Sequence, residues 1–243
     1  MSLAVQSLAV RHGQAPEGLV AIPVRTPLVR PGDDLIAMVA EAVRGIARPG
    51  DVVTISESAV AIAQGEFVVA ELVRPSRLAY ALSRRAGPLA TMSQPESVQL
   101  VIDRVGIGKV LYATVLQVVA RALGRRGAFY EVLGEAVAAF DGYTGTMPPY
   151  ERAIVFSPSD PRGMARAFRQ RAGIDCAVVD ANDLGKAKVL GTSDGVDASV
   201  VEAALLHNPH GNSDEQTPVV VLKWRGTGAG PLRLGCGPAA EIP

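Results

Sequence analysis

Oxygen-bearing side chains follow an apolar run near residue 180, in the sequence Cys176-Ala-Val-Val-Asp180-Ala-Asn182-Asp183. We predict a buried strand over 175–180 that delivers these carboxylate and amide groups to its end. Oxygen donors of this kind suit Mg²⁺ or Mn²⁺, which in turn hold the phosphates of anionic substrates. The stretch therefore indicates a metal site at the end of a strand.

Similar residues recur elsewhere beside predicted strands. The loop Asp214-Glu215-Gln216 comes shortly before an apolar run at 218–224, and Asp141 follows a stretch at 129–140 that we predict to form strands. Taken singly, each acid is explained by an Asx turn that ends a strand. Because loops at strand ends often carry sites, a functional site explains their recurrence as well as turn formation does.

Two other motifs are weaker. Gly106-Ile-Gly108-Lys109 shares part of a nucleotide-binding loop but lacks its remaining glycine and its Gly-Lys-Ser/Thr ending, so we interpret it as a turn that begins a helix. His207 and His210 could belong to a metal loop. A proline lies between them without the helical i, i+4 spacing, and a solvated loop after a helix is the preferred interpretation.

Helices and strands alternate irregularly around these candidates. Asp34 precedes apolar residues at helical spacing, Gly65 closes a short helical segment, and Asp160-Pro161 has the capping residue and N1 proline that open a helix. The remaining periodicity predicts helices at 34–46, 58–64, much of 76–122, from 161, and 197–206, and strands at 19–24, 52–55, 152–156, 175–180, 187–191 and 218–224. This order predicts an α+β fold with a mixed sheet.

Composition narrows the possible partners and location. The 243 residues carry 24 basic and 24 acidic side chains, and this balance argues against a nonspecific nucleic-acid binder. No apolar run approaches the roughly 20 residues that span a bilayer, so we expect no membrane segment. The start lacks the features of a signal peptide, and two cysteines fit a reducing compartment. We therefore expect a cytoplasmic protein.

Two stretches near the start also match a known pattern. Residues 26–35 read Thr-Pro-Leu-Val-Arg-Pro-Gly-Asp-Asp-Leu, and residues 49–53 read Pro-Gly-Asp-Val-Val before an Ala-Gln-Gly ending at 63–65. In these segments the chain resembles the coenzyme F420-0:γ-glutamyl ligase family. The second half, with a strand that ends near Asp180, is compatible with the family but resembles a paralogous branch.

The resemblance implies a two-domain α+β protein that forms an intertwined homodimer. Members of the family use GTP and a divalent metal, Mg²⁺ or Mn²⁺, to attach L-glutamate to a deazaflavin coenzyme precursor. The substrates are thus a small-molecule acid and an amino acid, and the acid is activated as an acyl phosphate. Here we expect one ligase-like domain of two joined subdomains over 1–225 and a glycine- and proline-rich tail over 226–243.

The resemblance also implies roles for single residues. Its nucleotide-contacting turn matches Pro27, Leu28 and Val29, and its metal-binding acid with a nearby nucleotide contact could correspond to Asp141 and Thr144.

A second metal-binding acid corresponds to Asp180, with Asp183 as the alternative. Asp214, Glu215 and Gln216 are then expected to recognise substrate or complete the metal shell.

Two departures from the family keep other functions open. Ile62 stands where the family has a lysine, and the family's Arg-Pro-Trp continuation is missing after Asp183. Ile62 offers phosphate neither charge nor donor. A regulatory or non-catalytic protein that binds a deazaflavin or another anionic ligand is therefore the alternative to the ligase, and a metal-dependent hydrolase that uses Asp180 and Asp214 is a third possibility.

Overall fold

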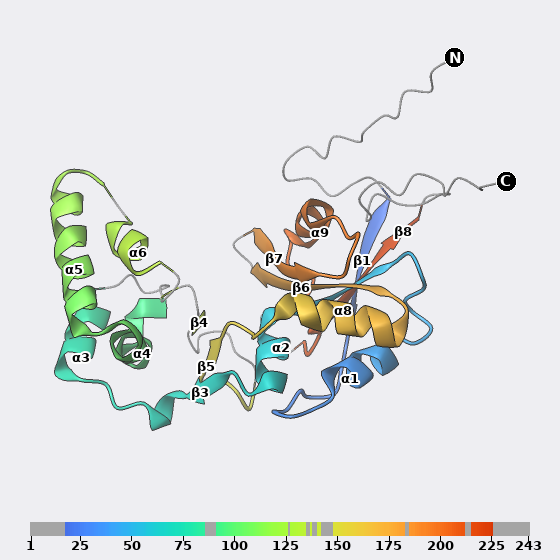
Figure 1. The fold of residues 1–243 in the computed structure, drawn as a ribbon, viewed down its shortest axis with the longest axis horizontal. Helices are drawn as coiled ribbons and strands as arrows, with labels where there is room; N and C mark the ends of the chain where they lie inside the picture. The colour runs from blue at the N-terminus through green and yellow to red at the C-terminus, as the bar shows by residue number, and fades with distance from the viewer. Residues whose placement is uncertain are drawn as a thin grey trace, which may run out of the picture. The chain divides into compact units, whose positions relative to one another are not determined.

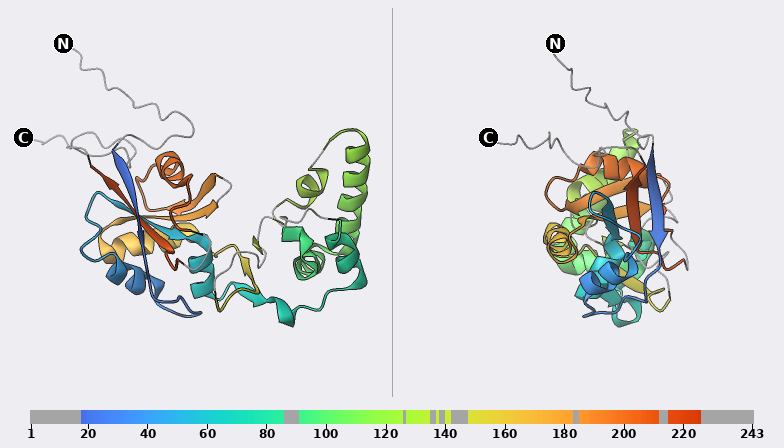
Figure 2. Two further views of the ribbon diagram at one scale, coloured as in Figure 1. Left: turned by 180° about the vertical axis from the view of Figure 1, so that it is seen from behind. Right: turned by 90° about the vertical axis from the view of Figure 1, so that its right-hand side faces the viewer.

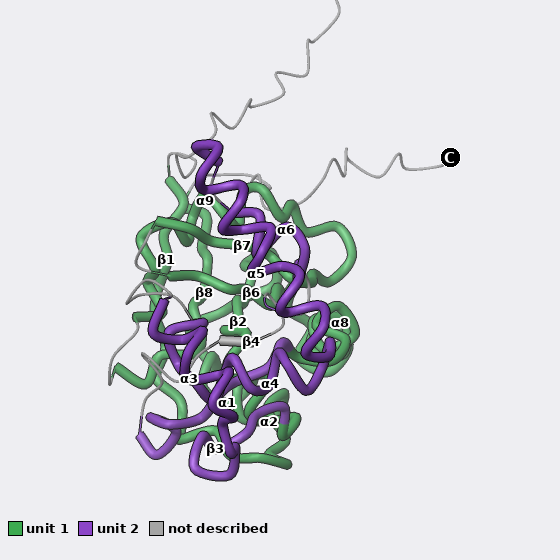
Figure 3. Tube along the Cα trace, turned by 90° about the vertical axis from the view of Figure 1, so that its left-hand side faces the viewer, with its two compact units in different colours: residues 1–65, 158–243 green, residues 66–157 purple. Residues whose placement is uncertain are grey.

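The computed structural model describes residues 18–85, 91–125, 127–134, 137, 140–141, 148–182, 185–211 and 215–225. The chain divides into two compact units, shown in different colours in Figure 3. Unit 1 contains residues 1–65 and 158–243, and unit 2 contains residues 66–157. Unit 2 is therefore an insertion in the sequence of unit 1.

A five-stranded sheet forms the centre of unit 1 (Figure 1). Its strands lie in the order β1 (Leu19–Val24), β8 (Val219–Trp224), β2 (Val52–Ser56), β6 (Asp175–Asn182) and β7 (Lys186–Thr192). Strands β2 and β6 run parallel, and all other neighbours run antiparallel. The predicted mixed sheet is confirmed, with each strand close to its predicted position.

Helices cover both faces of this sheet (Figures 1 and 2). On one face, α9 (Ala198–Leu205) packs over an apolar cluster that includes Ala177 and Val179 of β6. Residues alternate along a strand, so Cys176 and Val178 point to the opposite face. There α8 (Pro161–Ala172) contacts β6 and β7, while α2 (Glu57–Gln64) contacts β2 and β6. Burial on both faces explains the unbroken apolar run of β6.

Local capping explains where these helices begin and end. The Asp34 side chain accepts a hydrogen bond from Ala37 N at the start of α1 (Leu35–Ala42), and Asp160 accepts one from Gly163 N at the start of α8. Gly65 closes α2 with a φ of 74°, a left-handed conformation that glycine adopts without strain. Helix α1 is shorter than predicted, because residues 43–46 continue as tighter turns.

The described residues of unit 2 include helices α3 to α6 and a three-stranded sheet in the order β3-β5-β4. Its elements are β3 (Phe67–Val69), the 3-10 turn Ala70–Leu72, α3 (Arg77–Ser83), the 3-10 turn Thr91–Ser93, α4 (Pro95–Val105), α5 (Ile107–Ala122), α6 (Ala128–Leu133), β4 (Phe140–Asp141) and β5 (Ala153–Phe156). The predicted strands over 129–140 are wrong for the segment that forms α6. Phe129 and Leu133, one helical turn apart, both pack into the core of the unit.

Helix α5 is apolar on two sides. Val110 and Ala113 are fully buried in the core of unit 2, whereas Val115 and Val118 are 62% and 63% exposed on another side of the same helix. Within the described residues, no single helix is long and apolar enough to cross a membrane. Helices α4 and α5 meet these criteria only together, as a pair bent by 116°.

Candidate functional site at the edge of the unit 1 sheet

One edge of the unit 1 sheet collects the ends of all five strands. Strands β1, β2 and β6 end there, and β7 and β8 begin there, because β2 and β6 run parallel and their other neighbours are antiparallel. Ligands of open α/β sheets commonly bind beyond the carboxyl ends of the strands. Several of the predicted site residues lie at this edge.

The turn after β1 is joined to the segment before β8. Thr26 N donates a hydrogen bond to Gln216 O at 3.3 Å. Pro27 is exposed, Leu28 is half-buried, and Val29 is only 6% exposed. The structure thus joins the residue just before the turn predicted to border the nucleotide to Gln216, and within that turn Pro27 is the most accessible residue.

The segment before β8 has an unusual backbone. Gln216 has a φ of 56°, which is uncommon for a residue other than glycine, and Ser56 N donates a hydrogen bond to Pro218 O at 2.8 Å. Glu215 is exposed, and its carboxyl carbon lies 2.7 Å from the place where a Cβ on Gly211 would be. Strained backbone of this kind is often held at functional sites by the surrounding structure.

A buried histidine holds this segment in place. His210 Nε2 lies 3.3 Å from Thr54 Oγ1, its Nδ1 lies 3.3 Å from Thr217 O, and the Thr217 hydroxyl donates back to His210 O. Burial lowers the pKa of His210 to about 4, although hydrogen bonds to the backbone of Thr217 and Pro218 oppose this. The solvated loop predicted here is therefore wrong for His210, while His207 is exposed.

Asp180 lies at the carboxyl-terminal end of β6, directly opposite Lys188 on β7. The side chain is half-buried. Burial raises the pKa of the Asp180 carboxyl group, and the charge of Lys188 lowers it in part. Among the described residues, no three His, Cys, Asp or Glu side chains gather closely enough to hold a metal ion by themselves.

The other predicted residues are placed only in part. Asp141 belongs to β4 of unit 2, and its side chain is outside the described part of the structure. Thr144, Asp183 and Asp214 also lie outside the described residues. Their predicted convergence with Asp180 stays a prediction.

Ile62, in place of the lysine that the resemblance leads one to expect, is 6% exposed. This side chain is part of the core of unit 1, and a charged group there would lose its hydration.

Sequence reasoning did not select Ser56, Lys186 or Lys188. Ser56 caps α2 by accepting a hydrogen bond from Ala59 N, and both lysines are exposed on β7. The alternation of Lys186 and Lys188 with apolar residues was the available indication, since it places both lysines on one face of a strand.

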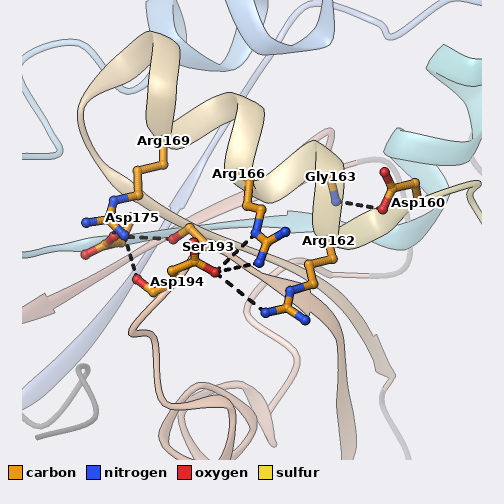
Figure 4. A network of polar contacts seen from close by, with 8 residues as sticks. All are labelled: Asp160, Arg162, Gly163, Arg166, Arg169, Asp175, Ser193 and Asp194. Carbon is orange, nitrogen blue, oxygen red and sulfur yellow. Dashed lines mark hydrogen bonds and ion pairs between the residues drawn. The ribbon is translucent and has the colours of Figure 1, made fainter.

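Three arginines of α8 form ion pairs with acidic residues of unit 1 (Figure 4). Arg166 donates to Asp194 Oδ1 at 2.9 and 3.1 Å, and Arg162 lies 3.6 Å from the same oxygen. Arg169 pairs at 3.1 Å with Asp175, which is 1% exposed. These contacts fasten α8 to β6 and to the end of β7, so the arginines act as structural side chains.

Comparison with known proteins matches the same region. The family model for F420-0:Gamma-glutamyl ligase matches residues 23–179, from the end of β1 almost to Asp180. The chain is also 28% identical over 165 residues to a Coenzyme F420:L-glutamate ligase of Methanopyrus kandleri, which covers 65% of this chain and 56% of that protein. The chain thus spans little more than half the length of this curated relative. Because the family model covers more than half of the chain, the protein belongs to the F420-0:γ-glutamyl ligase family.

Proposed function

We propose that this protein is an amide ligase that uses GTP and a divalent metal to join an amino acid, L-glutamate in the first instance, to a carboxylate of a deazaflavin coenzyme precursor. One observation carries the proposal: the family match spans the turn after β1, strand β2 and the first part of β6 up to residue 179, and these segments meet at one edge of the unit 1 sheet. The matched sequence therefore contributes the turn after β1 and strand β2 to this edge, and it ends one residue before Asp180.

The proposed reaction has two steps. A carboxylate oxygen of the precursor attacks the γ-phosphorus of GTP, which forms an acyl phosphate and releases GDP. The amine of the amino acid then attacks the acyl carbon, the C–O bond to phosphate breaks, and the amide forms with loss of inorganic phosphate and a proton. Such transfers depend mainly on positioning and on neutralising the phosphate charge.

The residues at the edge fit a hard divalent cation. Mg²⁺ is commonly held by one or two carboxylates, with substrate phosphates and water as its other ligands. Asp180 offers a carboxylate and Asn182 an amide oxygen at the end of β6. A bound Mg²⁺ or Mn²⁺ would supply charge neutralisation to the phosphates. We propose Asp141, and Asp183 as the alternative to Asp180, as further ligands.

The other residues predicted from the sequence would bind the organic substrates. Pro27, Leu28 and Val29 would border the nucleotide, and Thr144 would contact it as the resemblance implies. Asp214, Glu215 and Gln216 would recognise substrate or complete the metal shell. The hydrogen bond from Thr26 N to Gln216 O supports this assignment, since it ties the nucleotide segment to the substrate segment.

We further propose that the protein is a homodimer in which α5 pairs with its counterpart in a second copy. Ile107, Leu111, Val115 and Val118 are exposed at helical spacing, and a helix that is apolar on both sides is normally covered. A second copy presents the same stripe, so a two-fold pairing covers both stripes at once.

A product assay tests the ligase. The protein is incubated with F420-0, GTP, Mn²⁺ and L-glutamate, and mass spectrometry follows a product heavier by one glutamyl residue. We expect both the product and phosphate release only when F420-0 and L-glutamate are present together with GTP and Mn²⁺. If the protein binds F420-0 but forms no product with any nucleotide tested, the ligase is refuted in favour of the non-catalytic binding protein. If phosphate is released without glutamate, the result favours the hydrolase.

A further inference from the structure

We propose that Lys186 and Lys188 form a phosphate-binding pair that holds the metal-bound phosphates of the nucleotide at the end of the β6–β7 hairpin. This inference rests on the proposed function and adds residues to the site that neither the family match nor the sequence motifs assign. Lys186 and Lys188 lie beyond the matched range of 23–179.

Strand register places the pair beside the candidate metal ligands. Lys188 is directly opposite Asp180, and Lys186 is directly opposite Asn182. Directly opposite residues of antiparallel strands project from the same face of a sheet. Two cations and two oxygen donors therefore share one face at the edge where the strands of unit 1 end.

The identity of that face follows from the packing of β6. Ala177, Val179 and Ala181 belong to the cluster beneath α9. By alternation, Asp180 and Asn182 project from the other face, which α2 and α8 cover further along the strand. The four polar side chains thus continue the α2 and α8 face beyond its buried part, where a ligand can reach them.

The two lysines form no ion pairs with the described residues of the chain. Within the described part of the chain, neither ammonium group has a carboxylate within 4.0 Å, whereas Lys223 is paired with Asp51 at 3.1 Å and Arg166 with Asp194 at 2.9 Å. Lys188 is close enough to influence Asp180 without forming an ion pair with it. These two other cations of unit 1 are thus paired within the fold, whereas the β7 lysines are left for a ligand.

The combination of a carboxylate with two lysine ammonium groups favours one kind of ligand. A bare anion at Lys188 would also meet the carboxylate of Asp180. A nucleotide that arrives with its divalent cation satisfies every group, because the cation binds Asp180 and the phosphates contact the lysines. The Cα atoms of Lys186 and Lys188 are about 7 Å apart along the strand, so the two side chains can contact different phosphates of one nucleotide.

Affinity measurements on single and double variants test the pair. Calorimetry measures GTP binding in the presence of Mn²⁺ for the full-length wild type, Lys186→Met, Lys188→Met and the double variant. We expect roughly 10-fold weaker binding for each single variant, as for the loss of one charge-assisted contact, and a larger loss for the double variant. Lys188→Arg keeps the charge and should retain most of the affinity. Lys109→Met, which removes an exposed lysine on α5 in unit 2, is the matched control and should bind as the wild type does.

The possible outcomes separate this inference from the function on which it rests. If the wild type binds GTP with Mn²⁺ and the double variant binds equally well, the lysine pair is wrong and the ligase proposal stands. An equal loss in Lys109→Met would also overturn the pair. If the wild type binds no nucleotide, the proposed function itself fails. Melting temperatures without ligand show whether each variant is folded, and the salt dependence of binding should weaken in the double variant.

Discussion

Acidification should loosen the segment before β8 through a single side chain, His210. The imidazole lies between Thr54 Oγ1 and Thr217 O, both at 3.3 Å, and it is 6% exposed. Protonation places a charge where water cannot solvate it. The native state therefore favours neutral His210, which is why its pKa falls.

The size and sign of the effect follow from the two pKa values. A decrease from 6.5 to about 4 corresponds to about 3 kcal/mol between the charged and the neutral forms. Between pH 6.5 and 4 the unfolded chain binds the proton and the native protein does not, so the free energy of unfolding falls as the pH falls. The contribution of His210 is complete above pH 6.5 and is lost by about pH 4, with a slope of up to about 1.4 kcal/mol per pH unit.

Urea denaturation between pH 7.5 and 4 measures this slope. We compare the wild type with His210→Gln, which cannot titrate, and with His207→Gln, which removes an exposed histidine of the same region. The slope should flatten in His210→Gln and stay unchanged in His207→Gln. A lower stability of His210→Gln at pH 7.5 does not affect the comparison, because only slopes are compared. Parallel profiles for the wild type and His210→Gln would refute the reasoning.

Two further variants examine the proposed chemistry and assembly. Asp180→Asn should lower kcat/KM roughly 100-fold and raise the Mn²⁺ concentration needed for half-maximal activity, because an amide neutralises a cation less well than a carboxylate does; unchanged Mn²⁺ dependence would contradict a ligand role. Val115→Glu combined with Val118→Glu places charge on the exposed stripe of α5 and should convert a dimer to monomers in light scattering, and a mass unaffected by the double change would rule out this interface.

Much of the fold could be predicted because its local rules are simple. The strand over 175–180 is a short apolar run, and Asp160 with Pro161 opens a helix as expected. Residues 128–133 form a helix and not the predicted strand, although Phe129, Tyr130 and Val132 favour strands by composition. Packing of Phe129 and Leu133 against the core of unit 2 decided in favour of a helix, and that contact is not visible in local sequence.

The candidate site was harder to predict, because it depends on strand order. Asp180 could be selected from the end of its predicted strand and Gln216 from its loop, but their position at one sheet edge follows from the order of the strands in the sheet. Lys188 became a candidate only through its register with Asp180. His210 is polar and follows a proline, so its burial could not be read from neighbouring residues.

The insertion of unit 2 has a consequence for how the chain folds. Unit 1 must join β2 to β6 across the whole length of the insertion, and the entropy of closing such a loop opposes folding. Two contacts shorten this path. Strand β3 pairs with β5 where the chain enters and leaves unit 2, and Gln64 and Ser159 exchange hydrogen bonds of 2.9 and 2.8 Å at the two junctions in unit 1. Once unit 2 has formed, its ends are held together, and the sheet of unit 1 assembles as though its sequence were nearly continuous.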